Sequence, residues 1–164
     1  NESDDPKTFS ESMSDVYKSI STAFSAIGRW FSSISEWLSE GADEARLKAF
    51  ADGYPAAQFA RIVTAHSRAV ANLHRLDELD PESRRKVEES YVEIRMKMAE
   101  IHSSSQSKLT ELIRMRQTME SQLAEDPSRW TPEYVAKIRT LLDQHLATHT
   151  ATLQQLVDSV AGAA

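Results

Sequence analysis

The chain of 164 residues suits a single domain with its own core, and 40% hydrophobic with 27% charged residues is ordinary for a globular protein. Only 4 glycines are present and no glycine-rich phosphate-binding pattern occurs, which argues against a nucleotide-binding α/β fold. The absence of Cys excludes disulfides, thiolate metal sites and cysteine nucleophiles. The net charge of −6 disfavours nucleic acid as a partner, because the one tight basic cluster, residues 84–86, is surrounded by glutamates.

Residues 1–7 are predicted to be a disordered leader, and residues 8–164 to form one helical domain. The first predicted helix spans residues 8–39, where large apolar residues alternate at intervals of four and three from Met13 to Leu38. A second stripe, which includes Trp30 and Trp37, repeats every seven residues beside the first. This apolar face is wider than the seam of a two-stranded coiled coil, so we expect the helix to pack in a bundle interior.

The candidate interaction site lies in the second half of this helix. It consists of Phe24, Ile27, Trp30, Phe31, Ile34, Trp37 and Leu38. These side chains are expected to pack within this chain or in a homo-oligomer, or else to dock a protein partner. Membrane contact is a further hypothesis, because the serine-rich polar face resembles in composition that of lipid-packing-sensor helices. Three basic and seven acidic residues in the first forty count against attraction to anionic lipid.

Further helices are predicted over residues 43–52, 55–79 and 81–125. Asp80 is a good N-cap for the long helix and Pro81 suits its first position. The apolar seam of that helix is interrupted by the serine-rich stretch 103–107. Leu109 resumes it eleven residues after Met98, which is out of phase with a heptad. A bend, a loosened turn or a break is therefore expected at these serines.

The last helix is predicted over residues 132–160, with Thr131 as its N-cap and Pro132 at its first position. Short connections between helices favour antiparallel neighbours. The predicted fold is all-α, an elongated antiparallel helical bundle with about four main helices and one short helix.

Histidines supply the most distinctive polar pattern. His145 and His149 are four residues apart, so both project from one face of the last helix, where two imidazoles can reach one metal ion. His66 lies on an apolar seam and is the candidate third ligand. Two other hypotheses compete with this one: buried histidines bonded to their neighbours, and a pH sensor in which protonation weakens the bundle. No cofactor is assigned.

No nucleophile or paired acids occur in a recognisable catalytic setting, so the chain is predicted not to be an enzyme. The predicted function is that of a helical interaction protein (an adaptor, assembly or sensory bundle) whose partner is another protein or a second copy. The first alternative is a bundle that holds a metal, haem or apolar small molecule near His145 and His149. The second alternative is a membrane-interacting helical protein.

Overall fold

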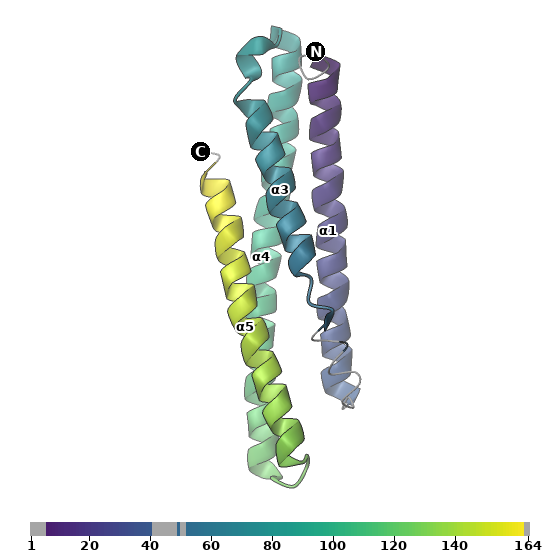
Figure 1. The fold of residues 1–164 in the computed structure, drawn as a ribbon, viewed down its shortest axis with the longest axis vertical. Helices are drawn as coiled ribbons and strands as arrows, with labels where there is room; N and C mark the ends of the chain where they lie inside the picture. Colours follow the sequence, from purple (N-terminus) through teal and green to yellow (C-terminus); the bar gives the residue numbers. More distant parts are fainter. Residues whose placement is uncertain (1–5, 41–48, 50–51, 163–164) are drawn as a thin grey trace.

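Apolar residues that recur at intervals of three and four place nearly all of the described chain in helices (Figure 1). This computed structural model describes residues 6–40, 49 and 52–162, and it describes the side chains of residues 12–33, 49 and 52–162. The described part forms four α-helices and a short 3-10 helix, with no strand. They are α1 (Pro6–Glu40), α3 (Ala56–Leu73), η2 (Leu76–Glu78), α4 (Pro81–Glu125) and α5 (Pro132–Ala161). The prediction of an all-α, elongated antiparallel bundle is confirmed.

The helix bounds differ little from those expected. α1 begins at Pro6, two residues before the predicted start, and α5 ends at Ala161, one residue after the predicted end. α4 has the predicted bounds, with the Asp80 carboxylate 2.7 Å from the backbone nitrogen of Ser83 and the Thr131 hydroxyl capping α5 in the same way. The predicted leader lies outside the described residues except for its last two, and the predicted short helix over 43–52 lies largely outside them.

The helix predicted over residues 55–79 is shorter than expected. α3 ends at Leu73, and the chain then tightens into the single turn η2. Arg84 of α4 holds this turn, because its guanidinium donates to the carbonyl oxygens of Leu76 and Leu79 at 3.2 and 3.3 Å. The turn buries Leu79, which is only 4% exposed, and places the next residue as the N-cap of α4.

The helix directions follow from pairs of contacts between helices. Ser105 of α4 contacts His149 of α5, and Arg116 contacts Asp143, so these two helices are antiparallel. Phe24 and Phe31 of α1 lie near Lys97 and Lys108 of α4, so α1 and α4 are parallel. Figure 1 shows α3 and α5 running in the opposite direction to that pair. α3 packs most extensively on α1, and α5 lies beside α4 and α3.

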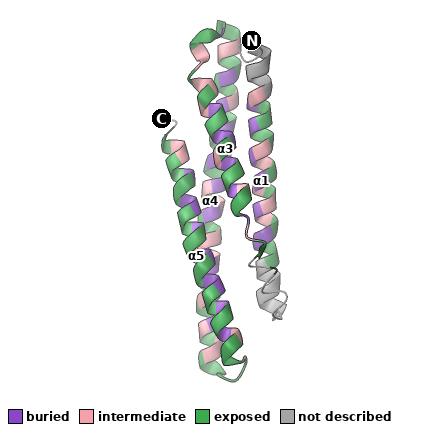
Figure 2. Ribbon diagram, in the orientation of Figure 1, coloured by how far each residue is buried: buried purple, intermediate pink, exposed green. Residues whose placement is uncertain are grey.

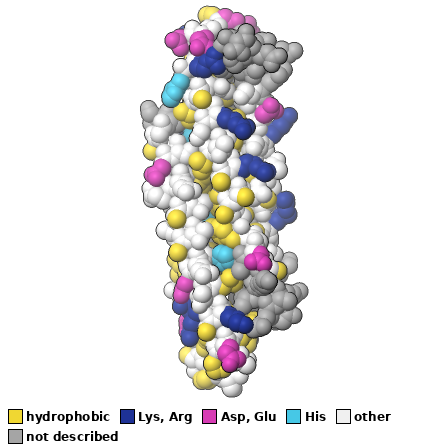
Figure 3. Space-filling view, viewed as in Figure 1, with side chains coloured by type: hydrophobic (Ala, Val, Ile, Leu, Met, Phe, Trp, Pro, Cys, Tyr) yellow, Lys and Arg dark blue, Asp and Glu magenta, His cyan; other side chains and the backbone are white. Residues whose placement is uncertain are grey.

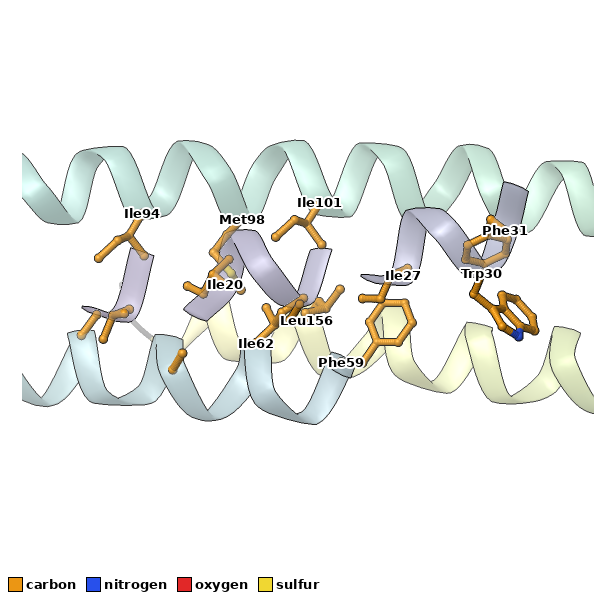
Figure 4. Packing of buried hydrophobic residues seen from close by; sticks show 14 of the residues in the cluster. Ile20, Ile27, Trp30, Phe31, Phe59, Ile62, Ile94, Met98, Ile101 and Leu156 are labelled. Atoms are coloured by element: carbon orange, nitrogen blue, oxygen red, sulfur yellow. The ribbon is translucent and has the colours of Figure 1, made fainter. Parts of the chain in front are cut away.

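The core is a column of side chains that all four helices contribute to (Figures 2 and 4). In Figure 4, residues of α1, α3, α4 and α5 point toward one another along the bundle axis. Fully buried members include Ile20, Ile62, Ile94, Ile101 and Leu156. Burying one such side chain stabilises the folded state by about 1.5–3 kcal/mol, so this column supplies most of the driving force for folding.

The buried face of α1 is rotated from the predicted seam toward the second stripe. Val16 and Ala23 of that stripe are buried, while Tyr17 of the seam is 37% exposed and Phe24 is half-buried. The wide apolar face explains the rotation, because α1 packs on two neighbours, α3 and α4, at once. The serines opposite bond their own helix, as Ser25 does to the carbonyl of Ser21 at 3.1 Å.

α4 is continuous through its serine-rich stretch, and the expected interruption of its seam is absent. Ser105 occupies the seam position, at 2% exposure, between Ile101 and Leu112. The buried seam therefore keeps its heptad spacing, and Leu109 lies only half-buried beside it. The small serine leaves room for the ring of His149, which bonds to the backbone oxygen of Ser105.

α4 and α5 extend together beyond α1 at one end of the rod (Figure 1). An ion-pair network joins the two helices there. Arg116 lies 3.0 Å from a carboxylate oxygen of Asp143 and 2.6 Å from one of Glu120, and Arg139 lies 2.7 Å from Glu120. The network lowers the pKa of Glu120, chiefly through the hydrogen bond from Arg139. The network thus links α4 to α5 at the end of the rod where α1 no longer covers them.

Candidate functional site

Two of the predicted site histidines lie in a cluster of aromatic rings at the middle of the bundle. We call this the histidine–aromatic cluster. It consists of Trp30 and Phe31 from α1, Tyr54 from the segment before α3, Phe59 from α3, and His145 and His149 from α5. Ring centroids of neighbouring members lie 4.8–6.4 Å apart, mostly edge to face, which is the favoured geometry for aromatic pairs.

His149 links three segments of the chain through both of its ring nitrogens. Nε2 lies 2.9 Å from the backbone oxygen of Ser105, and Nδ1 lies 3.3 Å from the hydroxyl of Tyr54. A carbonyl oxygen only accepts, so Nε2 carries the proton and Nδ1 accepts from Tyr54. Burial lowers the pKa of His149, and the bond to Ser105 opposes that shift. The neutral ring is thus the form that these partners fit.

His145 lies one turn before His149 on α5 and packs between two aromatic side chains. Its ring is stacked on Tyr54 at 4.9 Å and meets Trp30 edge to face at 5.3 Å. The ring is 6% exposed, and burial lowers the pKa of His145 to about 4. Burial also raises the pKa of Tyr54, an effect that a hydrogen bond to Thr152 reduces. His145 and Tyr54 are therefore both uncharged at neutral pH.

The segment that carries Tyr54 lies close against Trp30. A Cβ atom on Gly53 would lie 3.1 Å from the backbone oxygen of Ala49 and 3.5 Å from Cδ1 of Trp30. The distance to the backbone oxygen is tight and the distance to the indole is an ordinary van der Waals contact, so a larger residue here would press chiefly on the backbone of Ala49. Gly53 thus lets Tyr54 reach into the cluster.

His66 belongs to a second polar layer further along the bundle. Its Nδ1 lies 2.9 Å from the hydroxyl of Ser159, and its Nε2 lies 3.0 Å from the hydroxyl of Tyr91. Burial lowers the pKa of His66 and raises that of Tyr91. Ser159 is ten residues from His149 on α5, about 15 Å along a helix. The structure therefore brings His145 and His149 together and keeps His66 apart from them.

No group of three or more His, Asp or Glu side chains in the described residues is placed to hold a metal ion. At His149 both ring nitrogens already have partners within the protein. The two histidines on α5 thus serve as packing and hydrogen-bonding residues in this structure. Metal binding there stays a prediction, which titration with zinc or copper would test.

The described members of the predicted interaction site are built into this chain. Ile27, Trp30 and Phe31 are 3%, 8% and 2% exposed. Phe24 is half-buried, with the ammonium of Lys97 5.2 Å from its ring centroid. The side chains of Ile34, Trp37 and Leu38 lie outside the described residues. The first of the expected roles, packing within the chain, is thus visible, and partner docking by this helix stays a prediction.

α4 carries a second line of residues at heptad spacing on its solvent side, which we call the outer seam. It consists of Val92, Met96, Ala99, Ser103, Gln106 and Thr110, all exposed and none charged. Val92 is 56% exposed and Met96 is 68% exposed. These two apolar side chains lie on adjacent turns, and contiguous apolar surface open to water is one mark of a binding surface.

Charged residues lie on both sides of the outer seam. Glu93 and Glu100 lie on the side toward α1, where Glu100 pairs with Lys97 at 3.3 Å. Arg95 lies on the side toward α5, where it lines a groove of about 490 Å³ between α4 and α5. The other walls of this groove are mainly apolar and include Ala99 and Val157, the latter 41% exposed. The groove extends the apolar surface of the outer seam onto α5.

Three residues of these sites had only weak signals in the sequence. Tyr54 lies in a Gly-Tyr-Pro turn, where an aromatic residue beside a helix start is easily taken for a loop residue. Ser105 is polar, although its place four residues after Ile101 fits the seam. Met96 is one of several methionines on the same helix, and only its position opposite the buried seam distinguishes it from Met98.

No family model, curated protein or solved structure matches the chain. No helix of the described part is both long and apolar enough for a bilayer crossing. The functional argument therefore depends on the geometry of the chain itself.

Proposed function

We propose that this chain is a non-enzymatic helical interaction protein that presents the outer seam of α4 to a protein partner. The observation that carries this proposal is the exposure of Met96 and Val92, 68% and 56%, at adjacent turns of the longest helix. Methionine is enriched at protein interfaces because its flexible, polarisable side chain fits irregular surfaces. Fully burying such side chains contributes about 1.5–3 kcal/mol each, which gives a partner a reason to bind here.

The interior of the bundle supports this role by making α4 rigid. The buried face of α4 packs on α1 and α5, and the bond from His149 to the oxygen of Ser105 fixes its register against α5. The outer seam is therefore presented on a helix of fixed position, with little conformational freedom to lose when a partner binds. Preorganisation of this kind raises affinity by lowering the entropic cost of association.

The proposal is tested by placing a photo-reactive amino acid at position 96 and illuminating the protein in an extract of its own cells. The matched control carries the same group at Gln144, an exposed position on α5. We expect a discrete protein adduct from position 96 and none from position 144. The same adducts from both positions, or none from position 96, would contradict the proposal.

A further inference from the structure

We infer that the partner of the outer seam is a second copy of this chain, packed parallel to the first along α4 about a two-fold axis. This inference depends on the function proposed above and names the partner of that same surface. It goes further by specifying the orientation of the two helices and the charged pairs that align them.

The spacing of the outer seam matches what a helix partner requires. Its six positions are separated by 4, 3, 4, 3 and 4 residues, so the first and the last are 18 positions apart, about 27 Å along the helix. Val92 and Met96 supply apolar area, while Ala99 and Ser103 are small enough to let a second helix approach closely. No charged residue interrupts the line, although α4 is rich in charged residues on its flanks. A helix with two heptad seams is suited to two sets of helical neighbours.

The charges beside the seam favour a second copy and select its orientation. In a parallel pair of helices, the residue directly before a seam position such as Met96 meets the residue five positions later on the other helix. Arg95 of each copy then faces Glu100 of the other, which gives two ion pairs related by the two-fold axis. In an antiparallel pair, Glu93 would face Glu100, so like charges would meet, and Arg95 would face His102 in place of an acidic partner. The parallel arrangement is therefore the complementary one.

The seam ends where the charges stop being complementary. Glu88, Glu89 and Glu93 lie at its upper limit, beside Val92. Two helices that cross at about 20° move apart with distance from their point of closest approach. With that point near Ala99, the acidic residues of one copy lie away from those of the other. The predicted interface thus covers Val92 to Thr110 and excludes the first eleven residues of α4, about three turns.

The exposed area of the chain leaves enough surface for such a dimer. The total accessible surface is 9543 Å². An interface of standard size buries roughly 800 Å² on each partner, which is less than a tenth of this surface. The apolar groove between α4 and α5, which borders Ala99, can contribute to that area.

The absence of native cysteines allows a direct test by cross-linking. In the parallel dimer, Ala99 of one copy lies opposite Ala99 of the other, so Ala99→Cys should give a disulfide-linked dimer under mild oxidation. Gln144→Cys, exposed on α5, is the matched control and should remain monomeric on a non-reducing gel. Equal linkage in both variants, or none in Ala99→Cys, would overturn the proposed arrangement.

A charge exchange tests the orientation independently of disulfide formation. We expect Arg95→Glu and Glu100→Arg each to weaken self-association roughly tenfold in sedimentation, because two attractive pairs become repulsive. The double variant, Arg95→Glu with Glu100→Arg, should restore it. Weakening without restoration would overturn the parallel pairing.

The two proposals fail in distinguishable ways. A native chain that stays monomeric at 100 µM, yet still forms an adduct with another protein from position 96, would overturn the self-association and keep the interaction function. A monomeric chain that forms no adduct from position 96 would overturn both.

Discussion

The two faces of α4 have the same heptad spacing and opposite surroundings. The inner face, which includes Met98 and Ser105, is almost fully buried, while the outer seam leaves Met96 68% exposed. The residue types overlap, since each face contains a methionine and a serine. Spacing alone therefore does not distinguish a buried face from an exposed one, and the fold decides which face the chain itself covers.

The largest expected difference between the faces concerns the two methionines. Met98→Ala should lower the free energy of unfolding by about 2–5 kcal/mol, because it leaves a cavity in the core. Met96→Ala should change it by less than about 0.5 kcal/mol in the monomer, because its side chain is already in water. Urea unfolding at low protein concentration measures both values. Equal losses in the two variants would contradict the assignment of inner and outer faces.

The pH dependence of stability should also arise on the inner side of the bundle. Burial lowers the pKa of His145 from 6.5 to about 4, so the unfolded chain binds more protons between these values. Stability is therefore complete above about pH 6.5 and falls as the pH decreases toward 4. The loss from His145 is about 3 kcal/mol by pH 4, and His66 and His149 add to it in the same direction.

Thermal unfolding between pH 7.5 and 4.5 measures this loss. His145→Phe keeps a ring against Tyr54 and Trp30 and removes the titration of His145, so it should make the curve less steep while the contribution of His66 and His149 remains. The native chain, measured in parallel over the same pH range, is the reference for this comparison. A native protein that gains stability on acidification would contradict the buried neutral state of these rings.

The two serines offer a smaller test of the same contrast. Ser105→Leu should destabilise the fold by about 1–3 kcal/mol, because the larger side chain must fit where the ring of His149 packs. Ser103→Leu adds the same atoms on the outer seam, where nothing in the monomer covers them. It should leave unfolding within about 0.5 kcal/mol of the native value. Parallel measurements of the melting temperature distinguish the two positions.

The smallest effect is expected on the flank between the two faces. Lys97 places its ammonium 5.2 Å from the ring centroid of Phe24, so Lys97→Ala should cost about 0.5–1 kcal/mol. Lys86→Ala, on an exposed turn of the same helix, should change stability less. A larger loss for Lys86→Ala would contradict the contact between α1 and the flank of α4.

The sequence predicts most of the fold because the apolar spacing and the caps are strong local signals. Asp80 with Pro81 and Thr131 with Pro132 mark the starts of α4 and α5 without ambiguity. The sequence did not predict that α3 ends at Leu73. This end depends on Arg84, eleven positions later in the chain, which donates hydrogen bonds to the turn η2. Local propensity carries no information about such a contact.

The sites were predicted less completely than the fold. His145 and His149 were found together because their spacing places them on one face of a helix. Their partner Ser105 was missed because a buried serine looks like a break in an apolar seam. What lies opposite each ring depends on how four helices meet, and periodicity within one helix does not determine that arrangement.

Sedimentation equilibrium of the native chain beside Met96→Glu tests whether the outer seam is a self-association surface. The native chain should approach twice its mass of 18.4 kDa with increasing concentration, while Met96→Glu should stay at 18.4 kDa with an unchanged helical circular dichroism spectrum. A native chain that remains at 18.4 kDa, or a Met96→Glu variant that associates as strongly as the native chain, would contradict the assignment of the outer seam as a self-association surface.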